Sequence, residues 1–324
     1  MPTDRIISQE SRVESQESED RRVGFATEPD DQILSEKGFY WREKSGGKVL
    51  ICRALEEKGF VNGFSTRLGG VSPMPENDLN LSGFDDDSEE NILENRRRFL
   101  NVLGGDFTLA TAWQVHGIDV KTVENLDDAR DGNARFDALV SRLTNVLVGV
   151  KTADCVPVLL GDAKTKSFAA IHAGWRGTAH SIVTKAIEKM REIYGTNPKD
   201  LICAIGPAAV CNYEIGQDVI DAFSENFPNN SQHLFAPTRD GHAFVDLHRA
   251  NFEQLTATGV SKENIYAAPF CTLERTDLFF SYRKEKRLYG KTGRLLSVIG
   301  RKEAEARASG KGGENAKRKV QNAK

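Results

Sequence analysis

The sequence predicts an α/β fold, a single domain with a mixed β-sheet flanked by helices, spanning residues 40–302. Short strand-like segments alternate with amphipathic helical segments along this range. Neither an internal repeat nor a long linker rich in proline and glycine interrupts it. The chain has 324 residues, of which 39% are hydrophobic and 28% charged, as is typical of a globular protein with a sizeable core.

The strand-like segments are rich in β-branched and other apolar residues and end at glycine or at polar turns. In chain order they are KVLICRAL (48–55), VNGFSTR (61–67), TAWQVHG (111–117), VLVGVK (146–151), VPVLL (156–160), SFAAIH (167–172), LICAIGP (201–207) and LLSVIG (295–300). We expect them to form the mixed sheet.

Helical periodicity marks the segments that should cover this sheet. DSEENILENRRRFLNVLGG should form a helix with Asp87 as its N-cap and Gly104 near its end. TAHSIVTKAIEKMREIYG (178–195) has an apolar face from Ile182 to Ile193 and should close at Gly195. VDLHRANFEQLTATG (245–259) is the third predicted helix.

Charge is distributed unevenly between the ends of the chain. Residues 1–39 carry ten acids and five bases, and residues 301–324 carry eight bases and three acids. Both ends are poor in aromatic residues, so we expect a disordered acidic tail over 1–39 and a disordered basic tail over 303–324. The basic tail could touch nucleic acid or a membrane surface, but a solvated tail is the simpler interpretation, and no nucleic-acid partner is expected.

Composition also limits the compartment. No apolar run reaches the roughly 18 to 20 residues that a membrane span needs, and the first residues lack the apolar core of a secretory signal. The five cysteines, an odd number spread over a long chain, do not predict a disulfide framework. We therefore expect a cytoplasmic protein whose cysteines are thiols or metal ligands.

Three potential metal ligands lie at the ends of predicted strands. His116 closes WQVHG, Cys155 precedes VPVLL and His172 closes SFAAIH. Zinc favours such nitrogen and sulfur ligands, and three protein ligands leave a fourth tetrahedral position for water or substrate. The alternative is that Cys155 is a small buried residue and that both histidines are hydrogen-bonded core residues.

Arginines on glycine-rich turns indicate an anion. Arg176 in AGWRGT stands before a predicted helix start at Thr178, where free backbone N–H groups favour anions. Arg67 in FSTRLGGVS has a similar setting. Either loop could equally be a tight turn with a surface arginine.

Eight motifs occur in an order that resembles a known family: FSTRLGGVS, DLNLS, ENRRRF, WQVHG, KTADCVPVLL, AAIHAGWRGT, AIGPAAVCNYEIG and CTLERTDLFFSYRKEKRLYGKTGRLLSVI. The family is the laccase-domain proteins, long named multicopper polyphenol oxidases, with bacterial members called peptidoglycan editing factor. Its members are now regarded as zinc enzymes of the purine nucleoside phosphorylase type. The resemblance covers roughly residues 49–300 and implies a metal bound by His116, Cys155 and His172. CTLE departs from the usual CTYC-like motif, so no role is predicted for Cys271.

The resemblance implies a zinc-dependent purine nucleoside phosphorylase that acts on adenosine, inosine or S-methyl-5'-thioadenosine, with adenosine deaminase activity. Phosphate-binding candidates are Arg67, Arg176, Arg283 and Arg294, and Asn80 is a candidate polar contact. Asp154 and Gln114 could orient ligands or transfer protons, or could merely cap a turn and end a strand.

Alternative functions remain open at this point. The editing-factor name implies hydrolysis of a mis-incorporated amino acid on a cell-wall precursor, and a structural zinc module with charged tails is a third hypothesis. A copper-dependent polyphenol oxidase is disfavoured because the chain has six histidines and no H-x-H pair. Copper would nevertheless bind a Cys/His₂ site readily in vitro.

Overall fold

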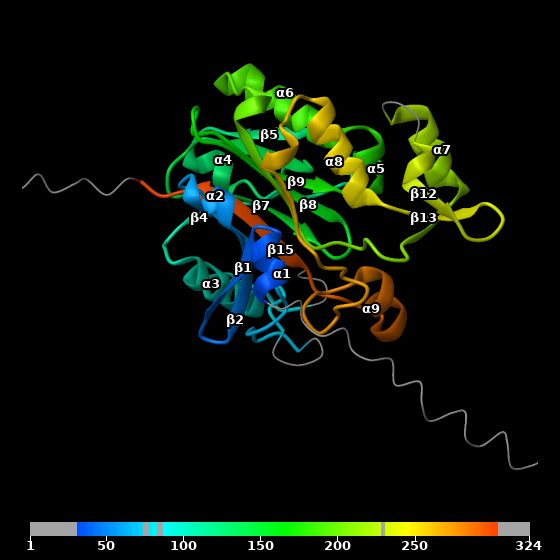
Figure 1. The fold of residues 1–324 in the computed structure, drawn as a ribbon. Helices are drawn as coiled ribbons and strands as arrows, with labels where there is room; N and C mark the ends of the chain where they lie inside the picture. The colour runs from blue at the N-terminus through cyan, green and yellow to red at the C-terminus, as the bar shows by residue number, and fades with distance from the viewer. Residues whose placement is uncertain (1–30, 74–77, 83–86, 228–230, 304–324) are drawn as a thin grey trace, which may run out of the picture.

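The computed structural model describes residues 31–73, 78–82, 87–227 and 231–303. It confirms an α/β fold, but the described strands form three sheets: two mixed six-stranded sheets and a smaller antiparallel three-stranded one. The two large sheets stack face to face, and helices cover the outer face of each (Figure 1).

The first sheet has the order β1-β2-β3-β15-β7-β4. Its strands are β1 (Phe39–Lys44), β2 (Gly47–Cys52), β3 (Val61–Ser65), β4 (Thr108–Ala110), β7 (Val146–Thr152) and β15 (Leu295–Arg301). β15, the last strand in the chain, lies between β3 and β7 and is antiparallel to both. β4 joins the edge in parallel with β7, which makes the sheet mixed.

The second sheet has the order β14-β10-β8-β9-β6-β5. Its strands are β5 (Val120–Val123), β6 (Ala138–Ser141), β8 (Val156–Asp162), β9 (Phe168–Ala173), β10 (Leu201–Ile205) and β14 (Ile265–Ala267). β8 and β9 form the central antiparallel pair, joined by a short polar turn. The third sheet consists of β11 (Glu214–Gly216), β12 (Phe235–Pro237) and β13 (His242–Val245).

The helices lie mainly outside the paired sheets (Figure 1). They are α1 (Asp31–Glu36), α2 (Arg53–Glu57), α3 (Glu89–Leu103), α4 (Leu126–Arg130), α5 (Trp175–Ala179), α6 (Ile182–Tyr194), α7 (Gln217–Asn226), α8 (Leu247–Ala257) and α9 (Tyr282–Tyr289). α6 packs on the second sheet with α8 beside it, and α3 packs on the first sheet. No described helix is long and apolar enough to cross a lipid bilayer.

The core is layered because strand side chains alternate between the two faces of a sheet. On β7, Val146, Val148 and Val150 belong to the cluster between the two sheets, whereas Leu147 belongs to the cluster under α3. On β15, Leu296 points to the α3 side in the same way. A third cluster fills the space between the second sheet and its helices.

Helix ends differ from the sequence-based expectations in several places. Ser88, not Asp87, is the N-cap of α3, and its hydroxyl accepts a bond from the Asn91 N–H. The predicted helix 178–195 is two helices, because Ser181 adopts a left-handed conformation with φ of 64° between α5 and α6. Ile193, expected on the apolar face, is 40% exposed. The predicted C-caps at Gly104 and Gly195 are confirmed.

The folded part begins before residue 40. Residues 31–36 form α1, and Leu34 and Phe39 are buried in the cluster between the sheets. The rest of the expected tails, 1–30 and 304–324, lies outside the described residues. Segment 111–117, predicted as a strand, contributes only an isolated bridge at Trp113 and otherwise forms the loop that carries His116.

Candidate metal centre

His116, Cys155 and His172 meet at one end of the stacked sheets. Cys155 lies directly before β8, and His172 lies on β9 opposite Pro157. The Sγ atom of Cys155 is 3.9 Å from Nε2 of His116. The ligand atoms of all three residues lie within 4.8 Å of one another, and the two imidazole rings meet edge to face. The structure thus brings together residues that are distant in sequence.

A buried carboxylate, Asp137, organises both histidines. Its Oδ1 lies 2.8 Å from Nδ1 of His172, so Nε2 of that ring is left to face the centre. The same carboxylate accepts the backbone N–H groups of Val115, His116 and Gly117. Asp137 therefore fixes one ligand by its ring and the other by its loop.

The charges of the centre are coupled. Burial alone would raise the pKa of Cys155, but the His172 and His116 imidazoles lower it to about 6. Burial likewise opposes protonation of His172, yet the Cys155 thiolate and Asp137 raise the pKa of that imidazole to about 9. The thiolate is the form of cysteine that binds metals. A metal ion bound by Cys155 and His172 would replace the proton of the His172 imidazolium as the positive charge beside the Cys155 thiolate.

Gly174 allows the backbone to approach the ligands closely. A Cβ atom at this position would lie 3.0 Å from Cδ2 of His116 and 3.3 Å from Sγ of Cys155. Gly174 is also the N-cap of α5, and Thr178, the expected cap, lies inside that helix. α5 is only 5 residues long. Arg176 lies on α5 and is exposed, and its guanidinium stacks on the Trp175 ring at 4.2 Å.

Asp154 braces the turn that presents Cys155. It has a positive φ of 87° and is buried. Oδ1 accepts the hydroxyl of Thr272, and Oδ2 accepts the hydroxyl of Ser281 and the N–H of Arg283. Burial raises the pKa of this carboxyl, and these donors oppose the rise. Both oxygens are thus engaged, which fits a positioning residue.

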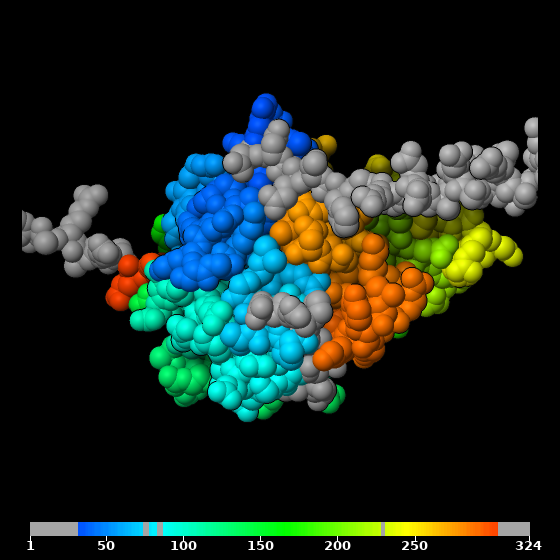
Figure 2. Space-filling model, turned by 90° about the horizontal axis from the view of Figure 1, so that it is seen from below, coloured from blue at the N-terminus to red at the C-terminus, as the bar shows by residue number. Residues whose placement is uncertain are grey.

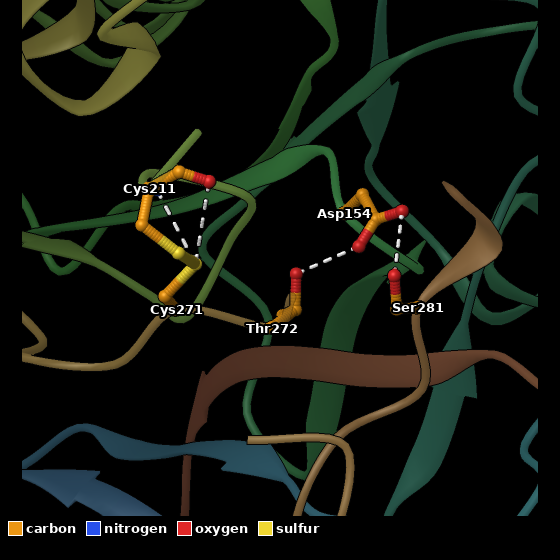
Figure 3. The surroundings of a disulfide bond; sticks show 5 residues. All are labelled: Asp154, Cys211, Cys271, Thr272 and Ser281. Carbon is orange, nitrogen blue, oxygen red and sulfur yellow. Dashed lines mark hydrogen bonds between the residues drawn. A yellow bond between two sulfur atoms is a disulfide. The ribbon is translucent and has the colours of Figure 1, made fainter. Parts of the chain in front are cut away.

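A disulfide joins two of the segments that hold Asp154, contrary to the expectation that no disulfide forms. Cys211 and Cys271 are bonded, and Thr272 directly follows the second of them (Figure 3). The Thr272 N–H donates to the Ala208 carbonyl oxygen, and the Ala209 N–H donates to the Asp154 carbonyl oxygen. The odd cysteine count concealed this pair; Cys52 and Cys203 are buried thiols, as expected.

Arg67, predicted to contact phosphate, lies inside the protein and is paired with carboxylates there. Its buried guanidinium forms ion pairs with Asp78 and Glu285, both at 2.6 Å, and donates to the Thr276 carbonyl oxygen. Asn80 is likewise buried: its Oδ1 accepts the N–H of Arg294, and its amide donates to Asp87. Both side chains are buried and hold neighbouring segments together by polar contacts.

The other predicted site residues lie around the centre. Arg283 is exposed, stacks over the Tyr213 ring at 4.5 Å and donates to the Glu214 carbonyl oxygen. The Gln114 side chain forms two 2.7 Å bonds with the backbone of Lys151, one as donor and one as acceptor. It is therefore a bracing residue near the strand end, which was the alternative considered for it.

The donor set fits a zinc ion. Zn–S and Zn–N bonds of about 2.3 and 2.1 Å place sulfur and nitrogen about 3.6 Å apart in a tetrahedral site. The Cys155–His116 separation of 3.9 Å is close to this value. His116 is exposed whereas His172 is buried, so the fourth position would face solvent. The Asp137–His172 pair is the usual partner arrangement of a metal-bound histidine.

Several functional candidates were missed in the sequence. Asp137 carries no local signal, because its partners are a histidine on another strand and a loop that precedes it. Tyr213 lies beside the centre: burial and then the Cys155 charge raise its pKa. His248 on α8 is bonded to the Gly206 carbonyl oxygen.

The chain is similar to known proteins over most of its length. A sequence model of the family described as multi-copper polyphenol oxidoreductase laccase matches residues 61–302. A purine nucleoside phosphorylase of Staphylococcus aureus is 34% identical over 261 residues, covering 78% of this chain and 95% of that protein. One from Staphylococcus saprophyticus is 35% identical over 258 residues, covering 76% and 94%.

Solved structures share the fold. YlmD from Geobacillus stearothermophilus superposes with a TM-score of 0.74 at 32% identity, covering 81% of this chain and 99% of that one. The Bacillus licheniformis hypothetical protein YfiH also gives a TM-score of 0.74, at 29% identity, covering 82% and 99%.

Proposed function

Because the chain belongs to the multi-copper polyphenol oxidoreductase laccase family, whose similar members include purine nucleoside phosphorylases, we propose that it is a zinc-dependent enzyme of that activity. It would convert adenosine, inosine or S-methyl-5'-thioadenosine and phosphate to the free base and the corresponding ribose 1-phosphate. Adenosine deamination would be a second activity of the same centre.

The observation that carries this proposal is an accessible Cys/His₂ centre with one ligand fixed by a buried carboxylate. His116, Cys155 and His172 would hold the zinc, which supplies a Lewis acid at an open coordination position. Asp137 keeps His172 in one tautomer, and Asp154 keeps the Cys155 turn in place. These residues preorganise the centre, so little rearrangement is needed when substrate binds.

Phosphate and the developing charge on ribose require cations near the centre. Arg283 is the exposed cation whose backbone is bonded to Asp154, next to Cys155. Its guanidinium stacks on the Tyr213 ring and donates one N–H to the Glu214 carbonyl oxygen. Because a guanidinium has five N–H donors, others can reach an anion. We assign Arg283 to substrate contact, with Arg176 and Arg294 as further phosphate-binding residues.

A copper oxidase with several metal centres is disfavoured further. Over the described ranges, a second group of potential ligands consists of Cys211, Cys271 and Glu274, and its two cysteines are consumed by the disulfide. The editing hydrolase remains the alternative, since an open zinc position would also serve amide hydrolysis. The sequence predicts a cytoplasmic location. Because the cytoplasm is reducing and disulfides are rare there, the Cys211–Cys271 bond does not favour that prediction.

The test is incubation of the zinc-loaded protein with adenosine and phosphate, followed by chromatography of the products. We expect adenine and ribose 1-phosphate, and their loss in His116→Ala and Cys155→Ala variants. His233→Ala is the matched control, because His233 pairs with Glu253 on the surface and should be dispensable. Absence of nucleoside turnover by the fully metallated protein would refute the proposal, and release of an amino acid from a cell-wall precursor would favour the alternative.

A purely structural zinc module is tested separately. A chain lacking 1–30 and 304–324 should retain full turnover if the metal centre performs the work. If turnover is lost while the zinc content and fold are unchanged, the terminal segments contribute to function.

A further inference from the structure

Three cations gather on the α3 face of the first sheet, and none of them is one of the three metal ligands. Lys151 lies four residues after Leu147 on β7, and it pairs with Leu296 of the neighbouring strand β15. Its side chain therefore points to the α3 side, as those of Leu147 and Leu296 do. Arg96 reaches this region from α3, and Arg294 from the residue before β15.

Segment 80–82 lies between the two arginines. The Leu81 N–H donates to the Arg294 carbonyl oxygen at 3.0 Å, and Nε of Arg96 donates to the Leu81 carbonyl oxygen at 3.1 Å. The side chain of Asn80 accepts the Arg294 N–H at 2.9 Å. Figure 2 shows the light-blue and cyan part of the chain, which includes α3, beside the orange C-terminal part on one face of the molecule.

The three positive charges are close enough to affect one another. Burial, followed by the charges of Arg96 and Arg294, lowers the pKa of Lys151 to about 8. Burial also lowers the pKa of Arg96. All three side chains are half-buried.

The carboxylates of the described residues do not pair with these three cations. Among the residues that the structure describes, no aspartate or glutamate forms an ion pair with Arg96, Lys151 or Arg294. Asp87, the acid bonded to Asn80, also accepts from Ser88 and Asn91. Arg67 shows the contrast, since two carboxylates neutralise it within the same region. Partly desolvated cations without counter-charges are costly unless an anion binds them.

We propose that Arg96, Lys151 and Arg294 form an oxyanion site that binds a phosphoryl group. Two guanidinium groups and an ammonium can supply charge-assisted hydrogen bonds to its oxygens. β7 ends at Thr152, so the chain runs directly from this site into the turn that carries Cys155. Gln114, two residues before His116, holds the Lys151 backbone. The site deepens the proposed function and rests on it for its role in turnover, although its affinity for an anion stands alone.

The phosphoryl group could come from inorganic phosphate, the co-substrate, or from a substrate that carries a phosphate of its own. The first measurement is therefore binding, by isothermal titration calorimetry of inorganic phosphate into the zinc-loaded full chain. We expect Lys151→Gln and Arg96→Gln to weaken phosphate binding by about 10- to 100-fold, the usual value of one charged hydrogen bond. Lys185→Gln is the matched control, because Lys185 pairs with Glu188 on the surface of α6.

A conservative variant guards against misfolding. Lys151→Arg should retain most of the phosphate affinity, and zinc content and melting temperature should match the unaltered protein in every variant compared. Unchanged phosphate affinity in folded Lys151→Gln and Arg96→Gln would overturn the proposal. So would failure of the unaltered protein to bind either inorganic phosphate or a nucleoside monophosphate.

Kinetic arms identify the source of the phosphoryl group. A raised KM for phosphate in Lys151→Gln with an unchanged KM for adenosine supports inorganic phosphate. Tighter binding of a nucleoside monophosphate than of its nucleoside, lost in the same variant, supports a phosphorylated substrate. If no nucleoside is turned over but Lys151→Gln and Arg96→Gln still lose phosphate binding, the oxyanion site is supported and the phosphorylase proposal is refuted.

Discussion

Asp137 determines how the two histidines present themselves to a metal. It bonds the His172 ring and three consecutive N–H groups of the His116 loop, and these donors lower the pKa of its carboxyl despite burial. Carboxylate partners of metal-bound histidines orient the ring and raise its basicity. The metal affinity of the protein should therefore depend on a residue that touches no metal.

Asp137→Asn should weaken zinc binding by about 10- to 100-fold, as loss of such a partner typically does. Competition with a chromophoric chelator measures this affinity. Asp131→Asn is the control, because that exposed acid pairs with Lys121 instead. Equal zinc affinity in a folded Asp137→Asn protein would show that the carboxylate does not support the centre.

Lys151 should make anion binding depend on pH. Its pKa is lowered to about 8 by burial, Arg96 and Arg294, so the ammonium is lost as pH rises through that value. Sulfate is the suitable probe because it does not titrate in this range. Sulfate affinity should be constant below about pH 7, fall as pH rises through about 8, and then approach a loss of about tenfold per pH unit. In Lys151→Arg the affinity should stay flat, and a flat profile in the unaltered protein would contradict the assignment.

At the scale of elements, the turns at one end of the sheets are tied together by polar contacts rather than by a continuous core. Asp154 joins the turn before β8 to the segment after Cys271 and to the start of α9. Arg67 joins the end of β3 to Asp78 and to Glu285 on α9. These ties explain how loops remain fixed around an accessible centre.

The disulfide should stabilise this end of the molecule. Replacing both Cys211 and Cys271 by serine should lower the free energy of unfolding by about 2–4 kcal/mol. Denaturant unfolding with and without a dithiol reductant measures the change, and the reductant should have no further effect on the double variant. If reductant leaves the midpoint of the unaltered protein unchanged, the bond contributes no stability.

Arg67→Met should destabilise the protein by about 3–5 kcal/mol, because it leaves Asp78 and Glu285 buried without their partner. Arg97→Met breaks only an exposed pair with Glu94 and should change stability by less than about 1 kcal/mol. Urea unfolding of the two variants gives the comparison. Similarly small losses of unfolding free energy in both variants would show that the Arg67 ion pairs do not stabilise the fold.

Sequence patterns predicted those parts of the molecule that depend on local periodicity or on recognisable motifs. The strands of 146–151 and 167–172 and the three ligands His116, Cys155 and His172 are of this kind, and the structure brings those ligands together. The ion pairing of Arg67 was not predictable from the sequence, because Glu285 is 218 residues away in the chain. Asp137 and the Cys211–Cys271 pair likewise depend on contacts that only the tertiary fold creates.

As a whole, the molecule places two chemically different sites at one end of its first sheet and the adjoining turn. The metal centre lies where the turns before β8 and around β9 meet, and the uncompensated cations lie on the α3 side of β7. Phosphorolysis can use both a Lewis acid, to polarise the substrate, and an oxyanion site, to hold phosphate. We therefore expect zinc at the Cys/His₂ centre to support phosphate-dependent cleavage of purine nucleosides.

The most direct measurement is product formation from adenosine and phosphate by the metal-stripped protein before and after addition of one equivalent of zinc. We expect adenine and ribose 1-phosphate only after zinc is restored, with no adenine when phosphate is omitted. The opposite result is a zinc-loaded protein that contains the metal but forms neither product, or a stripped protein that forms both at the same rate.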